Sequence, residues 1–577
     1  MKLSARQLFY LIIREKLSIL TICFLLMFAA CGSDGGEDDG TGRVFWAQDS
    51  ATEEYYQLRA DLLAEGQRCN VYVEQGLDLS KYKLAASSPD EMAQSVADAY
   101  DNDIYQIMID TFSVDGPIKD PKTKKTIGDN IMDFADYLSD GDGKLAILIL
   151  DIRGGTDRFY VAGYFAPLNL FSNDPRDPIL KYSNACDMIY INILSDPGTT
   201  ESNMTLAHEM QHMMCFATDV HTRGFIRAGV LDWNSMDTWI DEGLASAAEY
   251  VYLASTVGGH NQERIDHFND YKSPDTDIPD GNNFYVWGER ADYILDEYAT
   301  VYLFFQWLRL QSSLPNGSLN NYNIYKAIIG SKSYDQAAVV KALANKGNYL
   351  GETLNWETVL LDWFAANLLT FSDPATTYVG TLGKTPKHGY MEDPALSNLM
   401  PAVWTAKAGN SSAKAVTLYP GEGMYSTTDA KSITDSGGNI SYYNSLYGKG
   451  LSIKYAGVNI DLFNPDNYIH GDGTVSDAKT YLDGVLLTYN INASIKGSQE
   501  TGHVVANIVS TNTNFSLMKQ PAYSAKAMTS SNQAKTSSSQ TTATKPKKPH
   551  VISMGDMLRM NGHKDSGYDI KKFRMVK

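Results

Sequence analysis

The sequence predicts an α+β protein with three folded parts, and three observations predict their order. Residues 43–200 alternate short apolar runs with amphipathic stretches, which is typical of a mixed sheet with helices. Residues 201–375 have mostly helical spacing. Residues 401–523 contain short segments rich in branched and aromatic residues, separated by Gly, Asn, Asp and Ser, which predicts a small β-sandwich-like domain. We expect residues 376–400 to link the helical and β-rich parts.

The N-terminal segment predicts export. Residues 1–30 combine a basic start with an apolar run over residues 19–30, which is too short for a typical membrane-spanning helix. The run ends in small residues before Cys31 and resembles a bacterial lipobox, in which the cysteine carries the lipid. Residues 31–42 then form an acidic, flexible spacer. The sequence therefore predicts a lipoprotein held at Cys31 on the bacterial cell membrane, outer membrane or cell surface. An ordinary signal peptide is the alternative.

The first folded part is expected to contain several strands and helices. Apolar or alternating runs predict the strands, and amphipathic spacing predicts the helices. The expected strands cover residues 44–46, 69–74, 145–150 and 186–194, and the expected helices cover residues 53–65, 88–109 and 130–138. The last strand leads through a turn at residues 196–200 into the next helix.

The second and third parts are expected to be helical and β-rich respectively. The expected helices after residue 216 cover residues 237–255, 291–310, 323–329, 334–344 and 356–369. The expected strands cover residues 415–419, 440–443, 451–455, 458–463, 485–491 and 504–509. Residues 524–577 form a low-complexity tail with a weakly basic end, for which we expect disorder.

Composition excludes several classes of protein. The net charge of −19 argues against a nucleic-acid-binding protein, because no broad basic surface is implied. With 5 cysteines and no Cys-x-x-Cys pair, the chain is not a disulfide scaffold. An Asp-Gly-Asp-Gly run at residues 140–143 has acidic residues of the kind that bind calcium, but it lacks the other ligands of a calcium loop. We favour a plain turn there.

The most specific signal lies in residues 204–216, which include His208, Glu209 and His212. Residues four apart share one face of a helix, so both imidazoles can bind one metal ion while Glu209 remains beside it for proton transfer. This is the His-Glu-x-x-His pattern of zinc hydrolases. The surrounding residues are apolar, and a buried helix rarely carries such polar groups unless they are paired or bound. The alternative is a helix with two hydrogen-bonded histidines.

A catalytic zinc site needs a third protein ligand, and residues 239–250 offer one. The run Trp-Ile-Asp-Glu-Gly-Leu-Ala around Glu242 resembles the segment that carries the third zinc ligand in gluzincin metallopeptidases. The two metal-bearing runs together resemble the hyicolysin family of bacterial metallopeptidases, and this resemblance covers about residues 45–370. It implies a zincin-like core in which His208, His212 and Glu242 hold one Zn²⁺, with Glu209 as general base.

Further residues are expected to support the site. A carboxylate usually orients a ligating histidine, and we favour Glu249 over Asp241 for this role. By the same resemblance, Tyr298 is expected to stabilise the oxyanion, with Tyr302 and His260 as competitors. Cys215 is an alternative ligand, although a buried thiol is the favoured interpretation.

These patterns predict a zinc metallopeptidase, most simply an endopeptidase, that hydrolyses protein or peptide substrates outside the cytoplasm. Two alternatives keep the same helix. One is a catalytically weak surface lipoprotein that binds a protein partner. The other is a zinc hydrolase of non-peptide amides or esters, since the motif does not distinguish these substrates. The sequence does not predict an oligomeric state.

Overall fold

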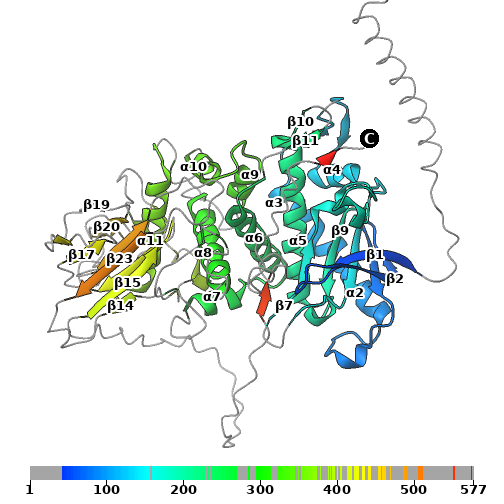
Figure 1. The fold of residues 1–577 in the computed structure, drawn as a ribbon, viewed down its shortest axis with the longest axis horizontal. Helices are drawn as coiled ribbons and strands as arrows, with labels where there is room; N and C mark the ends of the chain where they lie inside the picture. The colour runs from blue at the N-terminus through cyan, green and yellow to red at the C-terminus, as the bar shows by residue number, and fades with distance from the viewer. Residues whose placement is uncertain are drawn as a thin grey trace, which may run out of the picture.

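We describe a computed structural model of the chain. It describes residues 42–121, 123–155, 159–227, 230–232, 235–269, 294–312, 321–344 and 353–372, together with residues 278, 284, 285, 287 and 349 and short segments between 377 and 574. The predicted signal segment, Cys31 and most of the predicted tail lie outside the described residues. Figure 1 shows the sheet, the helices and the β-rich part following one another in chain order along the long axis.

The first part is built on a six-stranded mixed sheet. The strands are β1 (Arg43–Gln48), β2 (Tyr55–Glu65), β3 (Cys69–Glu74), β6 (Leu145–Leu150), β8 (Gly163–Phe165) and β9 (Met188–Asn192), and their order across the sheet is β1-β2-β3-β6-β9-β8. β3, β6 and β9 run parallel, while β8 pairs antiparallel with β9 at the edge. Every residue of β6 and β9 is buried, as expected for central strands covered on both faces.

The prediction of a helix over residues 53–65 was wrong, because this stretch forms β2. Its apolar positions also alternate, and Leu58, Ala60 and Ala64 are the residues that β2 buries. β2 pairs with β1 on one side and β3 on the other, with an irregularity between Leu62 and Ala64. Pairing with two neighbours therefore outweighs the local helical spacing.

The other predicted elements of this part are present. α2 (Pro89–Ala99) starts from the N-cap Ser88, with Pro89 in its first turn. A five-residue π-helical turn separates α2 from α3 (Tyr105–Phe112), so the single helix predicted over residues 88–109 is interrupted. α4 (Ile131–Leu138) begins with a capping box. The run at residues 140–143 forms a turn, and Gly141 and Gly143 take positive φ there.

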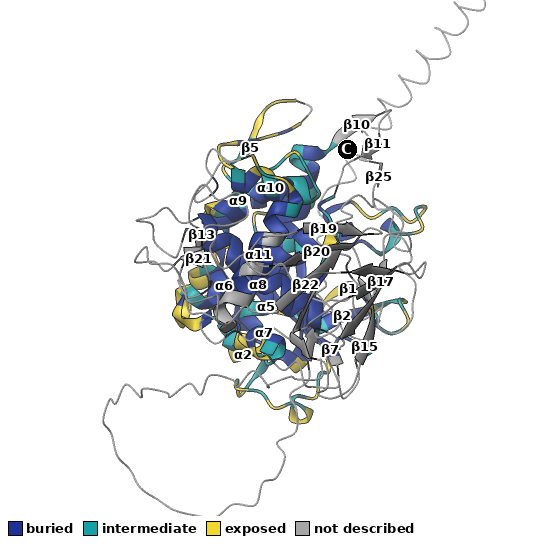
Figure 2. Ribbon diagram, turned by 90° about the vertical axis from the view of Figure 1, so that its left-hand side faces the viewer, coloured by how far each residue is buried: buried dark blue, intermediate teal, exposed yellow. Residues whose placement is uncertain are grey.

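The second part is a set of helices packed beside the sheet. They are α5 (Thr200–Thr218), α6 (Thr238–Thr256), α7 (Gln262–Asn269), α8 (Ile294–Ser312), α9 (Asn323–Ile329), α10 (Gln336–Ala344) and α11 (Trp356–Ser372). Figure 2 shows the central helices mainly in the colour of buried residues, and the buried apolar residues of α8 belong to one continuous core. None of the described helices is long and apolar enough to cross a membrane.

The third part contains two larger sheets. Their strands are β14 (Val403–Thr405), β15 (Ser412–Leu418), β16 (Gly423–Thr427), β17 (Ser432–Asp435), β18 (Ile440–Tyr442), β19 (Ser452–Tyr455), β20 (Val458–Leu462), β22 (Val485–Asn490) and β23 (Val504–Ser510). One sheet has the order β14-β16-β22-β20-β19 and the other β15-β23-β17-β18. Two short C-terminal strands, β24 (His550–Ile552) and β25 (Phe573–Arg574), return to the first half of the chain and pair with β7 (Phe159–Val161) and β11 (Val230–Asp232).

Several residues between positions 376 and 400 lie in the helical core. Tyr390, Leu396 and Leu399 are buried. The Tyr390 hydroxyl donates to the Leu303 carbonyl at 2.8 Å and accepts from Trp363 Nε1 at 3.0 Å. This segment therefore contributes both apolar and polar contacts to the packing around α8.

Candidate metal centre

The centre begins on α5, which follows directly from the sheet. β9 ends at Asn192, a short turn follows, and the Thr199 side chain caps the helix by accepting from the Ser202 backbone N–H. Apolar residues precede and follow the His-Glu-x-x-His motif within α5, and the helix is buried along most of its length. His208 and Glu209 are buried with it, and His212 lies one turn further along the same face.

α6 packs against α5 and brings Glu242 to the two histidines. Glu242 Oε2 lies 3.5 Å from His208 Nε2 and 3.7 Å from His212 Nε2. The ring centroids of the two imidazoles are 4.8 Å apart. One donor atom from each of the three residues lies within 4.8 Å of the other two. The structure thus brings together the three residues that the sequence proposes as ligands.

The surroundings of Glu242 Oε2 test whether a metal ion fits this group. Oε2 is buried and has no hydrogen-bond partner, although it faces two imidazole nitrogens. An unpaired buried carboxylate oxygen is costly, and a cation between it and the imidazoles removes that cost. Two nitrogens and one oxygen are also the donor set of a catalytic zinc site with one position open. The residues therefore fit a zinc ion.

Two carboxylates on α6 fix the outer nitrogens of the imidazoles. His208 Nδ1 lies 2.9 Å from Glu249 Oε1, and His212 Nδ1 lies 3.1 Å from Asp241 Oδ2. Glu249 is a hydrogen-bond partner of His208 Nδ1, so His208 presents its Nε2 lone pair toward Glu242. Asp241 lies at ion-pair distance from His212 Nδ1 without a hydrogen bond. The structure therefore gives one carboxylate to each histidine, whereas the sequence favoured Glu249 over Asp241.

These carboxylates make the site favourable for positive charge. Burial lowers the pKa of His208, but the carboxylates of Glu242 and Glu249 outweigh this effect and raise the pKa to about 10. At His212 burial also lowers the pKa, but Asp241 and Glu242 outweigh it and raise the pKa to about 9. The interactions that hold an added proton on these imidazoles also favour a metal ion, which displaces that proton.

Glu209 lies beside the proposed ligands and is held by the edge strand of the sheet. Its Oε2 accepts a hydrogen bond of 2.9 Å from the backbone N–H of Phe165 in β8. Burial raises the pKa of Glu209, and the two nearby histidines oppose that rise only in part. A carboxyl group with a raised pKa is better matched to exchanging protons near neutral pH than an exposed one.

Tyr298, rather than its two competitors, lies next to the proposed ligands. It is buried on α8, and its ring centroid is 6.4 Å from that of His208. His212, His208 and the Tyr298 hydroxyl together lower the pKa of Glu242 against the effect of burial. The Tyr302 hydroxyl is instead within 2.8 Å of His260 Nδ1 and accepts from Asn261 N at 3.1 Å. Both ring nitrogens of His260 have partners, since Nε2 lies 3.0 Å from Asp393 Oδ2.

Cys215, the alternative ligand, lies outside the group, and so does His221, which follows α5 in the chain. Cys215 is a buried free thiol, and burial raises its pKa well above the usual value. His221 Nε2 is 3.2 Å from the Lys119 carbonyl oxygen. Neither belongs to the His208, His212 and Glu242 group in the described part of the chain.

Three groups near the centre escaped prediction from the sequence. Arg264 on α7 binds Glu249 at 3.2 Å and lies 4.5 Å from the Tyr298 ring centroid. Asn261 Nδ2 donates to Glu249 Oε2 at 2.6 Å. The third is the Phe165 N–H. No motif marks a backbone donor or a partner on another helix. Only the packing of β8 against α5, and of the segment containing Asn261 and Arg264 against α6, would have revealed them.

Comparison with known proteins found a partial likeness. No family model matches the chain. A protein described as neutral metalloprotease ShpI, from Staphylococcus hyicus, is 28% identical over 312 residues, which cover 52% of this chain and 57% of that relative. The chain therefore spans little more than half the length of the relative. That relative is described as a metalloprotease, and the His-Glu-x-x-His helix of this chain indicates the same class of enzyme.

Proposed function

We propose that the chain is a zinc-dependent metallopeptidase of the hyicolysin-like, gluzincin type. In this proposal His208, His212 and Glu242 hold one Zn²⁺, and the sheet with its helices is a zincin-like core. The buried, unpaired Glu242 oxygen between two imidazoles carries the proposal. The similarity to a neutral metalloprotease also supports the proposal.

The protein groups then have distinct roles. A zinc ion in this site supplies Lewis acidity, which lowers the pKa of water and polarises a peptide carbonyl group. Glu209 accepts the proton of the attacking water and passes it to the leaving amine. The Phe165 N–H holds the other side of the Glu209 carboxylate, so its direction is set before substrate arrives. Tyr298 is placed beside Glu242 to donate to the developing oxyanion.

We further propose that the enzyme acts as an endopeptidase on proteins outside the cytoplasm, anchored through a lipid on Cys31. The lipobox-like end of the N-terminal apolar run supports this placement. The β-rich part, with its two sheets, is proposed as a separate β-sandwich-like domain.

Glu209→Gln tests the proposed chemistry. The amide keeps the size and the contact with Phe165 but cannot accept the proton, so cleavage of casein should fall by roughly 10²- to 10⁴-fold. Zinc content should stay the same as in the unaltered chain, because Glu209 is not a ligand. Equal cleavage by both proteins would contradict the role of Glu209. Bound zinc with no cleavage by either protein would favour a protein-binding role or a non-peptide substrate.

A further inference from the structure

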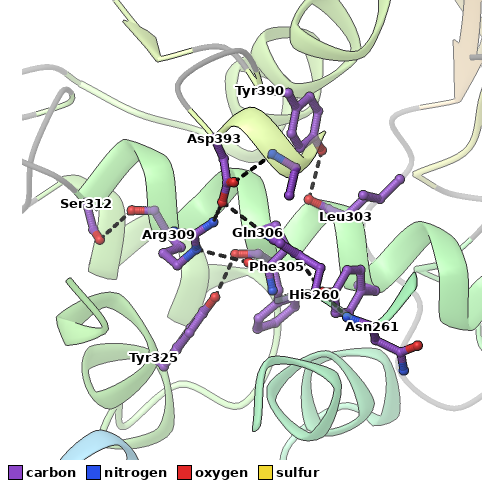
Figure 3. A network of polar contacts seen from close by, with 12 residues as sticks. His260, Asn261, Leu303, Phe305, Gln306, Arg309, Ser312, Tyr325, Tyr390 and Asp393 are labelled. Carbon is purple, nitrogen blue, oxygen red and sulfur yellow. Dashed lines mark hydrogen bonds and ion pairs between the residues drawn. The ribbon is translucent and has the colours of Figure 1, made fainter. Parts of the chain in front are cut away.

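Behind the proposed ligands, a chain of buried polar groups leads away from the metal centre. Glu249, which holds His208, also accepts from Asn261 Nδ2 at 2.6 Å. The Asn261 backbone N–H donates to the Tyr302 hydroxyl at 3.1 Å, and that hydroxyl is 2.8 Å from His260 Nδ1. The last step runs from His260 Nε2 to Asp393, as Figure 3 shows.

Hydrogen-bond chemistry assigns a donor and an acceptor to each link of this chain. An ionised Asp393 only accepts, so His260 donates from Nε2, and a neutral imidazole of that tautomer accepts at Nδ1. The Tyr302 hydroxyl then donates to His260, and its oxygen remains free to accept the Asn261 N–H. Asn261 in turn donates its amide hydrogen to Glu249. The roles of His260 and Tyr302 therefore follow from the charge at Asp393, while Asn261 donates toward both ends of the chain.

A buried cation stands at each end of the chain. Arg309 is fully buried and donates to Asp393 and to Gln306 (Figure 3). Its guanidinium group also lies 4.4 Å from the Tyr250 ring centroid. Arg264 binds Glu249 at the other end. Each of the two carboxylates thus has a buried cation beside it. The loss of one member of such a buried network leaves its neighbours without their hydrogen-bond partners.

Asp393 is itself held in place by its own segment. Its backbone N–H donates to the Tyr390 carbonyl at 3.0 Å, and its Oδ1 accepts from the Ala395 N–H at 3.2 Å. Asp393 is therefore a fixed point, although it lies 133 residues from His260 in sequence.

We propose that Asp393 is a positioning residue for the metal centre. It acts through His260, Tyr302 and Asn261 on Glu249, and so fixes the orientation of His208. The proposal rests on the proposed function, because it takes His208 as a zinc ligand. It adds a residue outside the ligand helices, from the segment that leads toward the β-rich part.

The test is the rate at which the full zinc-loaded chain loses zinc to a chelator. Asp393→Asn keeps the shape and removes the charge, and we expect roughly threefold to tenfold faster loss, somewhat below the effect of removing a direct partner of a ligating histidine. Tyr302→Phe removes only the hydroxyl that joins His260 to Asn261, and it should have the same effect. If Asp393 acts through Tyr302, the double variant should lose zinc no faster than either single variant.

Tyr390→Phe is the matched control, because Tyr390 is buried in the same segment but bonds to Leu303 and Trp363 instead. It should lower the melting temperature and leave zinc loss unchanged. Equal rates for the unaltered chain and Tyr302→Phe would overturn the proposal, even if Asp393→Asn does not fold. Additive effects in the double variant would overturn it too.

Glu249→Gln separates this proposal from the proposed function. Faster zinc loss in Glu249→Gln with no effect of Tyr302→Phe rejects the role of Asp393 and keeps the metal site. A chain that holds no zinc at all rejects the metal site, and the role of Asp393 with it.

Discussion

Two buried carboxyl groups of this protein, those of Glu249 and Asp187, differ in whether a positive group faces them. Arg264 and His208 outweigh the effect of burial at Glu249 and lower its pKa to about 2. Asp187 is also buried, but its neighbours include Asp140 and Asp136, and its pKa is raised well above the usual value, first by burial and then by those charges. Glu249 therefore stays charged at neutral pH, while Asp187 favours its protonated form.

Asp187→Asn should stabilise the protein at neutral pH. Because the folded-state pKa of Asp187 is raised, its favourable contribution is complete below the unfolded pKa of about 4 and is lost as pH rises through the folded value. Asparagine has no such loss and still accepts from Ser139 Oγ. Urea unfolding should show a gain on the order of 1 kcal/mol at pH 7 and almost none at pH 4.

The same measurement distinguishes a plain turn from a calcium site. Oxygens of Asp136, Asp140, Asp142 and Asp187 lie within 4.8 Å of one another. A plain turn predicts that millimolar calcium changes none of the unfolding curves. Stabilisation by calcium that disappears in both Asp187→Asn and Asp142→Asn would contradict that interpretation.

The packing of α6 against α8 sets the position of Glu242. A Cβ placed on Gly243 would lie 2.1 Å from Phe305 Cε2 on α8, so the two helices touch directly beside the proposed ligand. Glycine in a helix costs about 1 kcal/mol relative to alanine. The close approach gives a physical reason for keeping glycine at this position in spite of that cost.

Gly243→Ala should therefore destabilise the protein, although alanine is the better helix former. Overpacking costs about 1–3 kcal/mol, which equals or exceeds the helix-propensity gain. Because α6 must move away from α8, zinc should also be lost faster. Phe305→Leu provides the check, since the smaller side chain makes room for the new methyl group. If Gly243→Ala costs as much stability in the Phe305→Leu background as in the unaltered chain, the clash is not the cause.

Elements with a strong pattern could be predicted from the sequence, and those that depend on distant partners could not. The strand over Leu145–Leu150 and the buried α5 helix carry their signal locally. The sequence of β2 does not carry such a local signal. Pairing with its two neighbours in the sheet, and not the spacing of its apolar residues, decides its conformation. The same limit applies to the site. Two histidines four residues apart are visible in the sequence. Tyr298 and Tyr302 are also four residues apart and share one face of α8, so the choice between them depends on which turn of α8 lies beside Glu242.

Across the whole molecule, the centre draws on segments far apart in the chain. β8 holds Glu209, α5 and α6 supply the proposed ligands, α7 supplies Arg264, and the segment around Asp393 closes the network from the far side. Figure 1 shows α5 and α6 between the sheet and the remaining helices, so both ligand helices are supported on both sides. This arrangement favours a rigid metal centre, because every proposed ligand is fixed by packing that does not involve the metal.

The central claim is that His208, His212 and Glu242 hold one zinc ion. Its most direct test is the zinc content of the purified chain after dialysis against metal-free buffer, measured by atomic emission beside Glu242→Ala. We predict one zinc per chain for the unaltered protein and a content near zero for Glu242→Ala. A content well below one in the unaltered chain, or equal contents in both proteins, would contradict the claim.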